Sequence, residues 1–271
     1  MLNGITIGQF FPGNSILHRM DPRIKLILTL GYIIAVFVPQ NWVGLGIAIV
    51  FLLFSVLLSR LPLKLIWKSI KPILPLILFT TIINMLYVKG DTPLFDLGFI
   101  HITLEGVINA VFIAIRILCL IAGSSLLTYT TSPTALTDAL ERLMRPLAVL
   151  HVNVHEMAMM MTIALRFIPT LIDETDKIMS AQKARGADME SGGLMQRIRA
   201  LIPILIPLFV SSFRRAYELA MAMECRCYHG GEGRTRMKQL HMGKIDVWAL
   251  VVFGLLLGAV IALNFVVPKV L

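Results

Sequence analysis

Long apolar stretches dominate the chain, and they are bunched rather than alternating or periodic. The first stretch runs from about Ile24 to Leu58 and is interrupted at Pro39–Trp42, which predicts a helical hairpin with its tip at the interruption. A membrane-crossing helix needs ~20 residues, or ~17 at the short end. Further stretches at about 70–88, 104–128 and 247–267 meet this length, so the pattern predicts five membrane spans.

The composition supports a membrane protein. Apolar residues make up 57% of the 271 residues and charged residues only 15%. A soluble domain has roughly 45–50% apolar and about 25% charged residues, so lipid is expected to form part of the solvent around this chain. The three cysteines, Cys119, Cys225 and Cys227, are too few for a disulfide framework or a zinc site, and we expect free thiols.

The distribution of basic residues predicts the orientation. The net charge is +9, which in a soluble protein would suggest binding to nucleic acid. Here, if the N-terminus lies in the cytoplasm, only Lys89 and Lys269 fall outside the cell and Arg116 falls within a span. Basic residues collect on the cytoplasmic side of membrane proteins. We therefore expect a multi-pass protein of the cell membrane with its N-terminus inside and its C-terminus outside, and no nucleic-acid partner.

Three regions follow from the spans. Residues 1–129 form an N-terminal transmembrane region of about four spans, residues 130–243 a cytoplasmic region, and residues 244–271 a C-terminal transmembrane helix. The predicted fold class is an all-α integral membrane protein, with about five transmembrane helices plus long cytoplasmic helices.

The cytoplasmic region is itself rich in apolar residues. Val152–Ile172 and Leu201–Val210 are strongly apolar, although charged residues interrupt the first and Pro203 and Pro207 interrupt the second. Such helices are expected to bury an apolar face against a partner or to lie along the membrane. An alternative topology would insert one of them, and the charges and prolines favour the first interpretation. Nine of the fifteen methionines lie between Met157 and Met223, where they fill gaps in a helix interface or form a surface that adapts to several partners.

Two helix ends in this region share one layout. Each is a helix of some five turns that ends in a small residue, an arginine and a second small residue, followed by a helix breaker. The tripeptides are Ala184-Arg185-Gly186 and Cys225-Arg226-Cys227. A cation at a helix C-terminus is favourable by ~0.3–1 kcal/mol, which suffices to explain a single arginine. Two matched ends instead predict arginines that project into two similar grooves of a partner.

These tips, together with His18-Arg19-Met20-Asp21-Pro22-Arg23-Ile24-Lys25-Leu26, resemble the motifs of a known family. The chain is similar over nearly its whole length to the transmembrane (T) component of energy-coupling factor transporters, the modular ABC-type importers of vitamins and metal ions. Methionine at position 20 differs from the family signature, and cysteines replace the commoner alanine and glycine of the second tip.

The resemblance implies a non-catalytic subunit that links ATP hydrolysis to uptake of vitamins or other micronutrients. Its expected partners are two ABC ATPase subunits (a homodimer or a heterodimer), a small substrate-binding membrane protein called the S component, possibly one of several, and the lipid bilayer. The resemblance assigns ATPase coupling to Ala184, Arg185, Gly186, Cys225, Arg226 and Cys227. ATP would be bound by the partners, so no cofactor is expected on this chain.

Other sequence features leave alternatives open. The chain has no P-loop, no H-E-x-x-H and no G-x-S-x-G, so we expect neither ATP binding nor hydrolase chemistry. His151 and His155 lie one helical turn apart, but without a third ligand we expect no metal site. Arg116 could serve a function or make a structural hydrogen bond. A membrane-embedded enzyme and a stand-alone transporter are the alternative functions.

Overall fold

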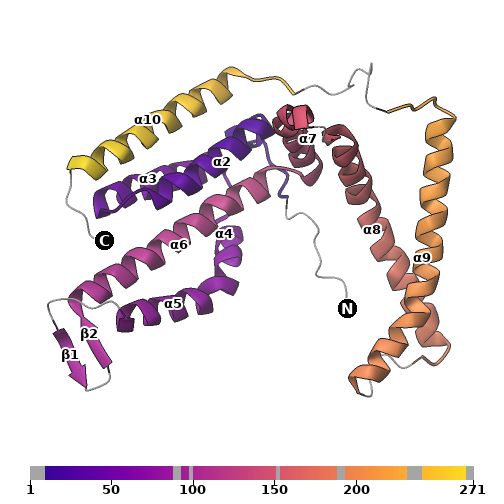
Figure 1. Cartoon of the computed structure of the whole chain (residues 1–271), viewed down its shortest axis with the longest axis horizontal. Helices are drawn as coiled ribbons and strands as arrows, with labels where there is room; N and C mark the ends of the chain where they lie inside the picture. Colours follow the sequence, from indigo (N-terminus) through magenta and orange to yellow (C-terminus); the bar gives the residue numbers. More distant parts are fainter. Residues whose placement is uncertain are drawn as a thin grey trace. The chain divides into compact units, whose positions relative to one another are not determined.

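The computed structural model describes residues 10–87, 93–97, 100–150, 153–187, 193–230 and 240–266. The chain divides into two compact units. We call the described residues of 8–139 and 239–271 the bundle unit, and those of 140–238 the helix-pair unit. Figure 1 shows that both units are built mainly from helices, so the prediction of an all-α membrane protein is confirmed.

The bundle unit contains most of the elements. In chain order they are α1 (Ile16–Arg19), α2 (Pro22–Phe37), α3 (Trp42–Ser59), α4 (Leu63–Ile70), the 3-10 turn η1 (Lys71–Ile73), α5 (Leu74–Tyr87), β1 (Pro93–Leu97), β2 (Ile100–Thr103), α6 (Leu104–Thr130) and α10 (Lys244–Val266). Helix α7 (Pro133–Met144) begins in this unit and ends in the helix-pair unit, which also holds η2 (Arg145–Leu150), α8 (Val154–Ala184) and α9 (Leu194–Glu224).

The described residues include five helical segments long and apolar enough to cross a membrane. They are Trp42–Ser59, Leu63–Tyr87, Leu104–Thr130, Ile198–Glu224 and Lys244–Asn264. Four of them coincide with predicted spans. The difference is that α2 has only 16 residues, whereas part of α9 has sufficient length and composition. Length and composition thus satisfy the alternative topology as well, while the prolines and charges of α9 still favour the first.

Contacts at both ends of α2 show that it runs the length of α10. At one end, the Asp21 backbone N–H donates to Asp246 Oδ1 at 2.9 Å. At the other end, Asn264 Nδ2 donates to the Val38 carbonyl at 2.6 Å, and the Gln40 N–H donates to Asn264 Oδ1 at 3.0 Å. Helix α2 and its flanking residues therefore match α10 in length, which supports α2 as a span. The hairpin tip predicted at Pro39–Trp42 lies beside the C-terminal end of α10.

Helix α6 lies at the centre of the bundle unit, in contact with α2, α3, α4 and α5 (Figure 1). The core contains Tyr32, Ala35, Leu52 and Cys119, all buried. Helices α2 and α6 approach closely because Gly123 faces the Tyr32 ring. A Cβ added at Gly123 would lie 2.4 Å from a ring carbon of Tyr32. By contrast, a Cβ added at Gly254 or Gly258 of α10 would meet no atom of the described residues within 4 Å.

Two short elements were not predicted. The segment between α5 and α6, which lies between two predicted spans, includes an antiparallel hairpin in which Asp96 pairs with His101. The apolar stretch predicted to begin near Ile70 is preceded by the separate helix α4, which is strongly amphipathic. The chain turns at Pro72 in η1 before α5 begins. An amphipathic helix with exposed Trp67 and Lys68 fits the membrane interface.

The His18–Leu26 motif forms a polar junction, which we define as Asp21, Arg23, Lys25, Thr130 and Asp246. Asp21 caps α2 and accepts from the Arg23 N–H at 2.9 Å. Lys25 Nζ donates to the Thr130 carbonyl at 2.9 Å and to Thr131 Oγ1 at 3.3 Å. The interpretation of Lys25 as a topology signal therefore missed its structural role, since this lysine is buried and bonds the C-terminal end of α6.

Arg116 makes a structural bond within the bundle unit. Its Nη2 donates to the Pro39 carbonyl at 2.6 Å, and its guanidinium lies 4.8 Å from the centre of the Phe112 ring. These contacts favour the structural alternative for Arg116, because the tip of the α2–α3 hairpin supplies an acceptor for this half-buried cation. Asn41 contributes at the same tip, where its side chain donates to the Leu263 carbonyl at 3.0 Å.

Candidate functional site

The first predicted tip is the C-terminal end of α8. Arg185 is the C-cap, and Gly186 follows in the left-handed region with φ of 84°. The Gly186 N–H donates to the Lys183 carbonyl and the Ala187 N–H to the Gln182 carbonyl, both at 3.0 Å. These two bonds define a Schellman motif, which satisfies carbonyls that the helix itself leaves unpaired. The glycine is required because its φ is costly for any residue with a Cβ.

The second tip, at the end of α9, has the same geometry. Arg226 occupies the C-cap position, and the next residue, Cys227, has a φ of 54°. The Cys227 N–H donates to the Glu224 carbonyl at 2.8 Å and the Tyr228 N–H to the Met223 carbonyl at 3.0 Å. This is again a Schellman motif. The two arginines thus occupy equivalent positions, although cysteine at the left-handed position carries a steric cost of ~1–2 kcal/mol that glycine avoids.

Both tips are open to the surroundings. All six residues that the sequence analysis assigned to them are exposed, and Cys225 and Cys227 are free thiols. Within the part of the chain that the structure describes, the Arg185 and Arg226 side chains have neither a hydrogen bond nor an ion pair. A Cβ added at Gly186 would meet nothing within 4 Å. The guanidinium groups therefore keep all their donors for a group outside this chain.

The two tips lie at opposite ends of an antiparallel helix pair (Figure 1). Gln182, near the end of α8, donates to the Pro203 carbonyl early in α9 at 3.4 Å. Tyr228, just after α9, donates to Met159 Sδ near the start of α8 at 2.9 Å. Arg226 therefore lies near the start of α8 and Arg185 at its end. At 1.5 Å per residue, the tips are separated by roughly 40 Å along the pair.

A polar contact holds the middle of the pair together. Glu174 on α8 forms an ion pair with Arg215 on α9 and accepts from Ser211 Oγ at 3.2 Å. The Arg215 guanidinium, followed by the Ser211 hydroxyl, lowers the pKa of Glu174 from its ordinary value of 4.5. The carboxylate thus stays ionised at neutral pH, and this contact fixes the register of the two helices.

The apolar faces of the pair are largely uncovered. Among the described residues of this unit, the buried apolar ones are Val154, Ala158 and Ile204. Exposed apolar residues line both helices, including Met157, Met160, Met161, Leu201, Ile202, Leu205, Ile206, Phe209, Val210 and Phe213. A contiguous apolar surface of this kind marks a protein or membrane contact. Five of the nine methionines are exposed, which for these five favours an adaptable surface over gap-filling between α8 and α9: Met157, Met160, Met161, Met195 and Met221.

His151 and His155 were considered as metal ligands because they lie one helical turn apart in the sequence. His155 Nδ1 lies 2.9 Å from Glu141 Oε1, and His151 lies outside the described residues. In the ranges that the structure covers, no group of three or more His, Cys, Asp or Glu side chains is arranged to hold a metal ion.

Comparison with known proteins gives one matching family and several similar proteins. The cobalt transport protein family, CbiQ, matches residues 13–237. An energy-coupling factor transporter transmembrane protein EcfT of Clostridium kluyveri is 53% identical over 247 residues, which cover 91% of this chain and 92% of the relative. The protein of the same name from Ruminiclostridium cellulolyticum is 54% identical with the same coverage. The one from Thermosediminibacter oceani is 49% identical over 262 residues, 97% of this chain and 98% of the relative.

Proposed function

The chain belongs to the CbiQ family as an EcfT-type transmembrane component of energy-coupling factor transporters, and from this premise we propose that its two arginine-capped helix ends attach it to two ATPase subunits. The observation that carries the proposal is the pair of exposed Schellman ends with equivalent arginines at Arg185 and Arg226. A partner of two similar subunits offers two similar grooves. The separation of roughly 40 Å lets one rigid pair reach both.

The chemistry of each tip suits such a groove. The residues on either side of each arginine are small, so the helix end can enter a narrow space while the side chain projects forward. The guanidinium fork pairs bidentately with carboxylates or carbonyl oxygens of the partner. The Schellman bonds already satisfy the last carbonyls of the helix, so no backbone group is left unpaired when the tip is desolvated.

The antiparallel pair gives the proposed mechanism. ATP-driven closure of the two ATPases would move the tips at Arg185 and Arg226 relative to each other. Helices α8 and α9 would transmit this displacement to a substrate-binding membrane subunit, which contacts their exposed apolar faces and releases a vitamin or other micronutrient inside. The prolines within the two helices, Pro169, Pro203 and Pro207, each remove a backbone hydrogen bond and provide places where the helices can bend.

The proposed orientation follows from charge. We place the N-terminus and the helix-pair unit in the cytoplasm, because both are rich in basic residues and the basic residues of membrane proteins concentrate on the cytoplasmic side. ATP hydrolysis is carried out by the partner subunits in this proposal, and this chain contributes mechanical coupling.

The test replaces the two arginines in the assembled transporter. Arg185→Ala and Arg226→Ala singly should each weaken ATPase co-purification, and the double variant should abolish it together with uptake. A hydrogen bond to a charged group is worth ~1.5–3 kcal/mol, or about 10- to 100-fold in affinity. Arg214→Ala is a matched control, since this arginine is exposed on α9 away from the tip. Wild-type co-purification and uptake in the double variant would refute the proposal.

A second experiment tests the partners themselves. Purification of the full chain in mild detergent should bring along two ATPase chains and a small hydrophobic protein. Recovery of the chain alone, with transport activity of its own in liposomes, would favour the stand-alone transporter instead.

A further inference from the structure

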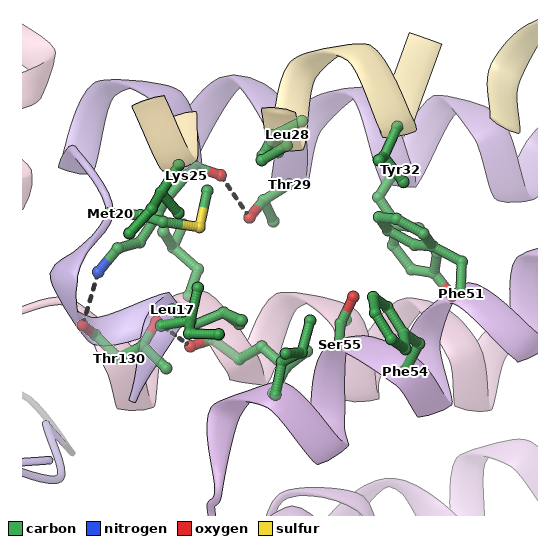
Figure 2. A pocket seen from close by; sticks show the side chains of 18 of the residues that line it. Leu17, Met20, Lys25, Leu28, Thr29, Tyr32, Phe51, Phe54, Ser55 and Thr130 are labelled. Atoms are coloured by element: carbon green, nitrogen blue, oxygen red, sulfur yellow. Dashed lines mark hydrogen bonds between the residues drawn. The ribbon is translucent and has the colours of Figure 1, made fainter. Parts of the chain in front are cut away.

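The bundle unit contains an apolar cavity of about 430 Å³ between α1, α2, α3, α6 and α10 (Figure 2). One end is closed by aromatic rings. Tyr32 stacks on Phe51 with ring centres 6.0 Å apart, and Phe51 lies 6.0 Å from Phe253. The cavity opens sideways where α3 and α10 carry Phe54 and Trp248, which are 53% and 70% exposed. Its volume lies in the ~300–1,000 Å³ range of ligand sites.

A second hollow continues from the first at the other end. The two share four lining residues, namely Ile16, Phe54, Leu58 and Ile245. The second hollow adds Arg19 and Arg60, and Lys244 lines the first. Neither lining includes an acidic residue. The combined space is therefore apolar and aromatic at one end and basic at the other.

The three cations at the basic end are available to a ligand. Arg19, Arg60 and Lys244 are exposed, and their side chains have no hydrogen bond or ion pair with any described residue. Lys25 also lines the cavity but differs from them, because its Nζ is bonded to the Thr130 carbonyl (Figure 2). Lys25 is thus a structural group, whereas the other three lack a counterion within the described ranges.

From these observations we infer that the space binds an anionic phospholipid, with its phosphate between Arg19, Arg60 and Lys244 and an acyl chain directed toward Tyr32 and Phe51. The charge complementarity selects an anionic headgroup, and the apolar lining selects a chain rather than a free anion. Ser55 faces the cavity (Figure 2), and its hydroxyl has no partner among the described residues, so it can donate to an ester carbonyl. With the orientation proposed above, the lipid belongs to the cytoplasmic leaflet. The inference does not depend on the attachment of ATPases.

The test is native mass spectrometry of the full chain in mild detergent, with phosphatidylglycerol, phosphatidylcholine or inorganic phosphate added separately. We expect one phosphatidylglycerol to be retained at least about fivefold more than phosphatidylcholine. Phosphatidylglycerol should also raise the unfolding temperature progressively as its concentration increases, as a ligand of the folded state does. Inorganic phosphate should do neither, since it lacks the chain. Equal retention of the two lipids, or an equal effect of inorganic phosphate, would overturn the inference.

Variants locate the site. The triple variant Arg19→Gln, Arg60→Gly, Lys244→Gln should lose the preference for phosphatidylglycerol. Glycine is chosen at position 60 because Arg60 has a φ of 52°, so the backbone is relieved rather than strained. The matched control, Lys64→Gln, Lys68→Gln, Lys71→Gln, removes the same charge from exposed positions outside both hollows and should keep the preference.

A variant that fills the cavity tests the contribution of the apolar end separately from that of the basic end. Ser55→Phe should reduce retention of phosphatidylglycerol without changing the charge. Unchanged retention in this variant or in the triple variant, or an equal loss in the lysine control, would contradict the assigned site. Circular dichroism of each variant identifies any that fails to fold. Arg60→Gly alone removes one charge and relieves the backbone. Its retention of phosphatidylglycerol then tests the basic end independently.

Discussion

The two units of the chain differ in how much of their apolar surface is buried. The bundle unit buries an apolar core around α6 together with bonded polar groups, such as Lys25 and Asp246, and it exposes further apolar side chains on helices long enough to cross a membrane. The helix-pair unit keeps few apolar side chains inside and exposes the rest, together with both arginine tips. Lipid can cover the exposed apolar side chains of the bundle unit, whereas the exposed faces and tips of the helix-pair unit are proposed to be covered by partners. Substitutions should therefore act on stability in the first and on assembly in the second.

The largest effect on stability is expected at Asp246. This buried carboxylate accepts from the Asp21 N–H at 2.9 Å and the Gly243 N–H at 2.7 Å. Asp246→Ala leaves the buried Asp21 N–H unpaired and also removes the bond to the more exposed Gly243 N–H, at a cost of about 2–4 kcal/mol. Thermal unfolding of the detergent-solubilised chain measures it. Asp246→Asn keeps one oxygen acceptor and should recover part of the loss, and an alanine variant as stable as the parent would show that the polar junction is not structural.

The next effect is expected where α2 and α6 meet. Gly123→Ala places a methyl group against the Tyr32 ring, and the strain should destabilise the bundle by about 1–3 kcal/mol. The matched control is Gly254→Ala on α10, where the added methyl meets no described atom. Thermal unfolding should separate the two variants clearly. Equal midpoints would contradict the close approach of α2 to α6.

A smaller pair of effects distinguishes the two tips. Cys227→Gly should stabilise the end of α9 by about 1 kcal/mol, because glycine adopts the left-handed conformation without steric cost. Gly186→Ala should destabilise the end of α8 by a similar amount. Hydrogen exchange of the amides in the last helical turn of α8 and α9 reports both changes. Changes of the same sign at the two tips would show that they do not share one geometry.

The smallest effect concerns the Glu174–Arg215 ion pair. Because the folded pKa of Glu174 is lowered, its stabilising contribution is present above pH 4.5 and is lost as the pH falls further through the lowered pKa. We expect Glu174→Gln to leave the unfolding midpoint nearly unchanged at neutral pH, since partly exposed pairs contribute little. It should also flatten the pH dependence below 4.5. A parent chain with no such dependence would exclude this contact in solution.

Much of this arrangement follows from the sequence because it is local. Continuous apolar runs predicted α3, α6 and α10 to within a few residues. The tripeptides around Arg185 and Arg226 predicted two matched helix ends, since a left-handed cap depends on neighbouring residues. The role of Lys25 could not be predicted, because its acceptor at Thr130 is more than a hundred positions away. Helix α4 was missed because its eight residues merge with the apolar run that follows.

The cavity beside α2 and α10 could not be predicted from the sequence either. Its walls come from five helices, and nothing in the positions of Phe51 and Trp248 along the chain indicates that a space lies between them. The basic residues at its open end, Arg19, Arg60 and Lys244, contributed to the predicted orientation. That prediction explains their side of the membrane but not why they lack a counterion among the described residues. The sequence predicts on which side of the membrane a basic residue lies. Only the packing of the helices shows which group neutralises its charge.

The uncovered apolar faces of α8 and α9 have a consequence for the life of the protein in the cell. Exposed apolar surface is what chaperones and proteases recognise in unfolded chains. A copy synthesised in excess of its partners would display that surface continuously, however well its bundle had folded. Its abundance is therefore expected to follow the supply of the other subunits, with the surplus removed by proteolysis.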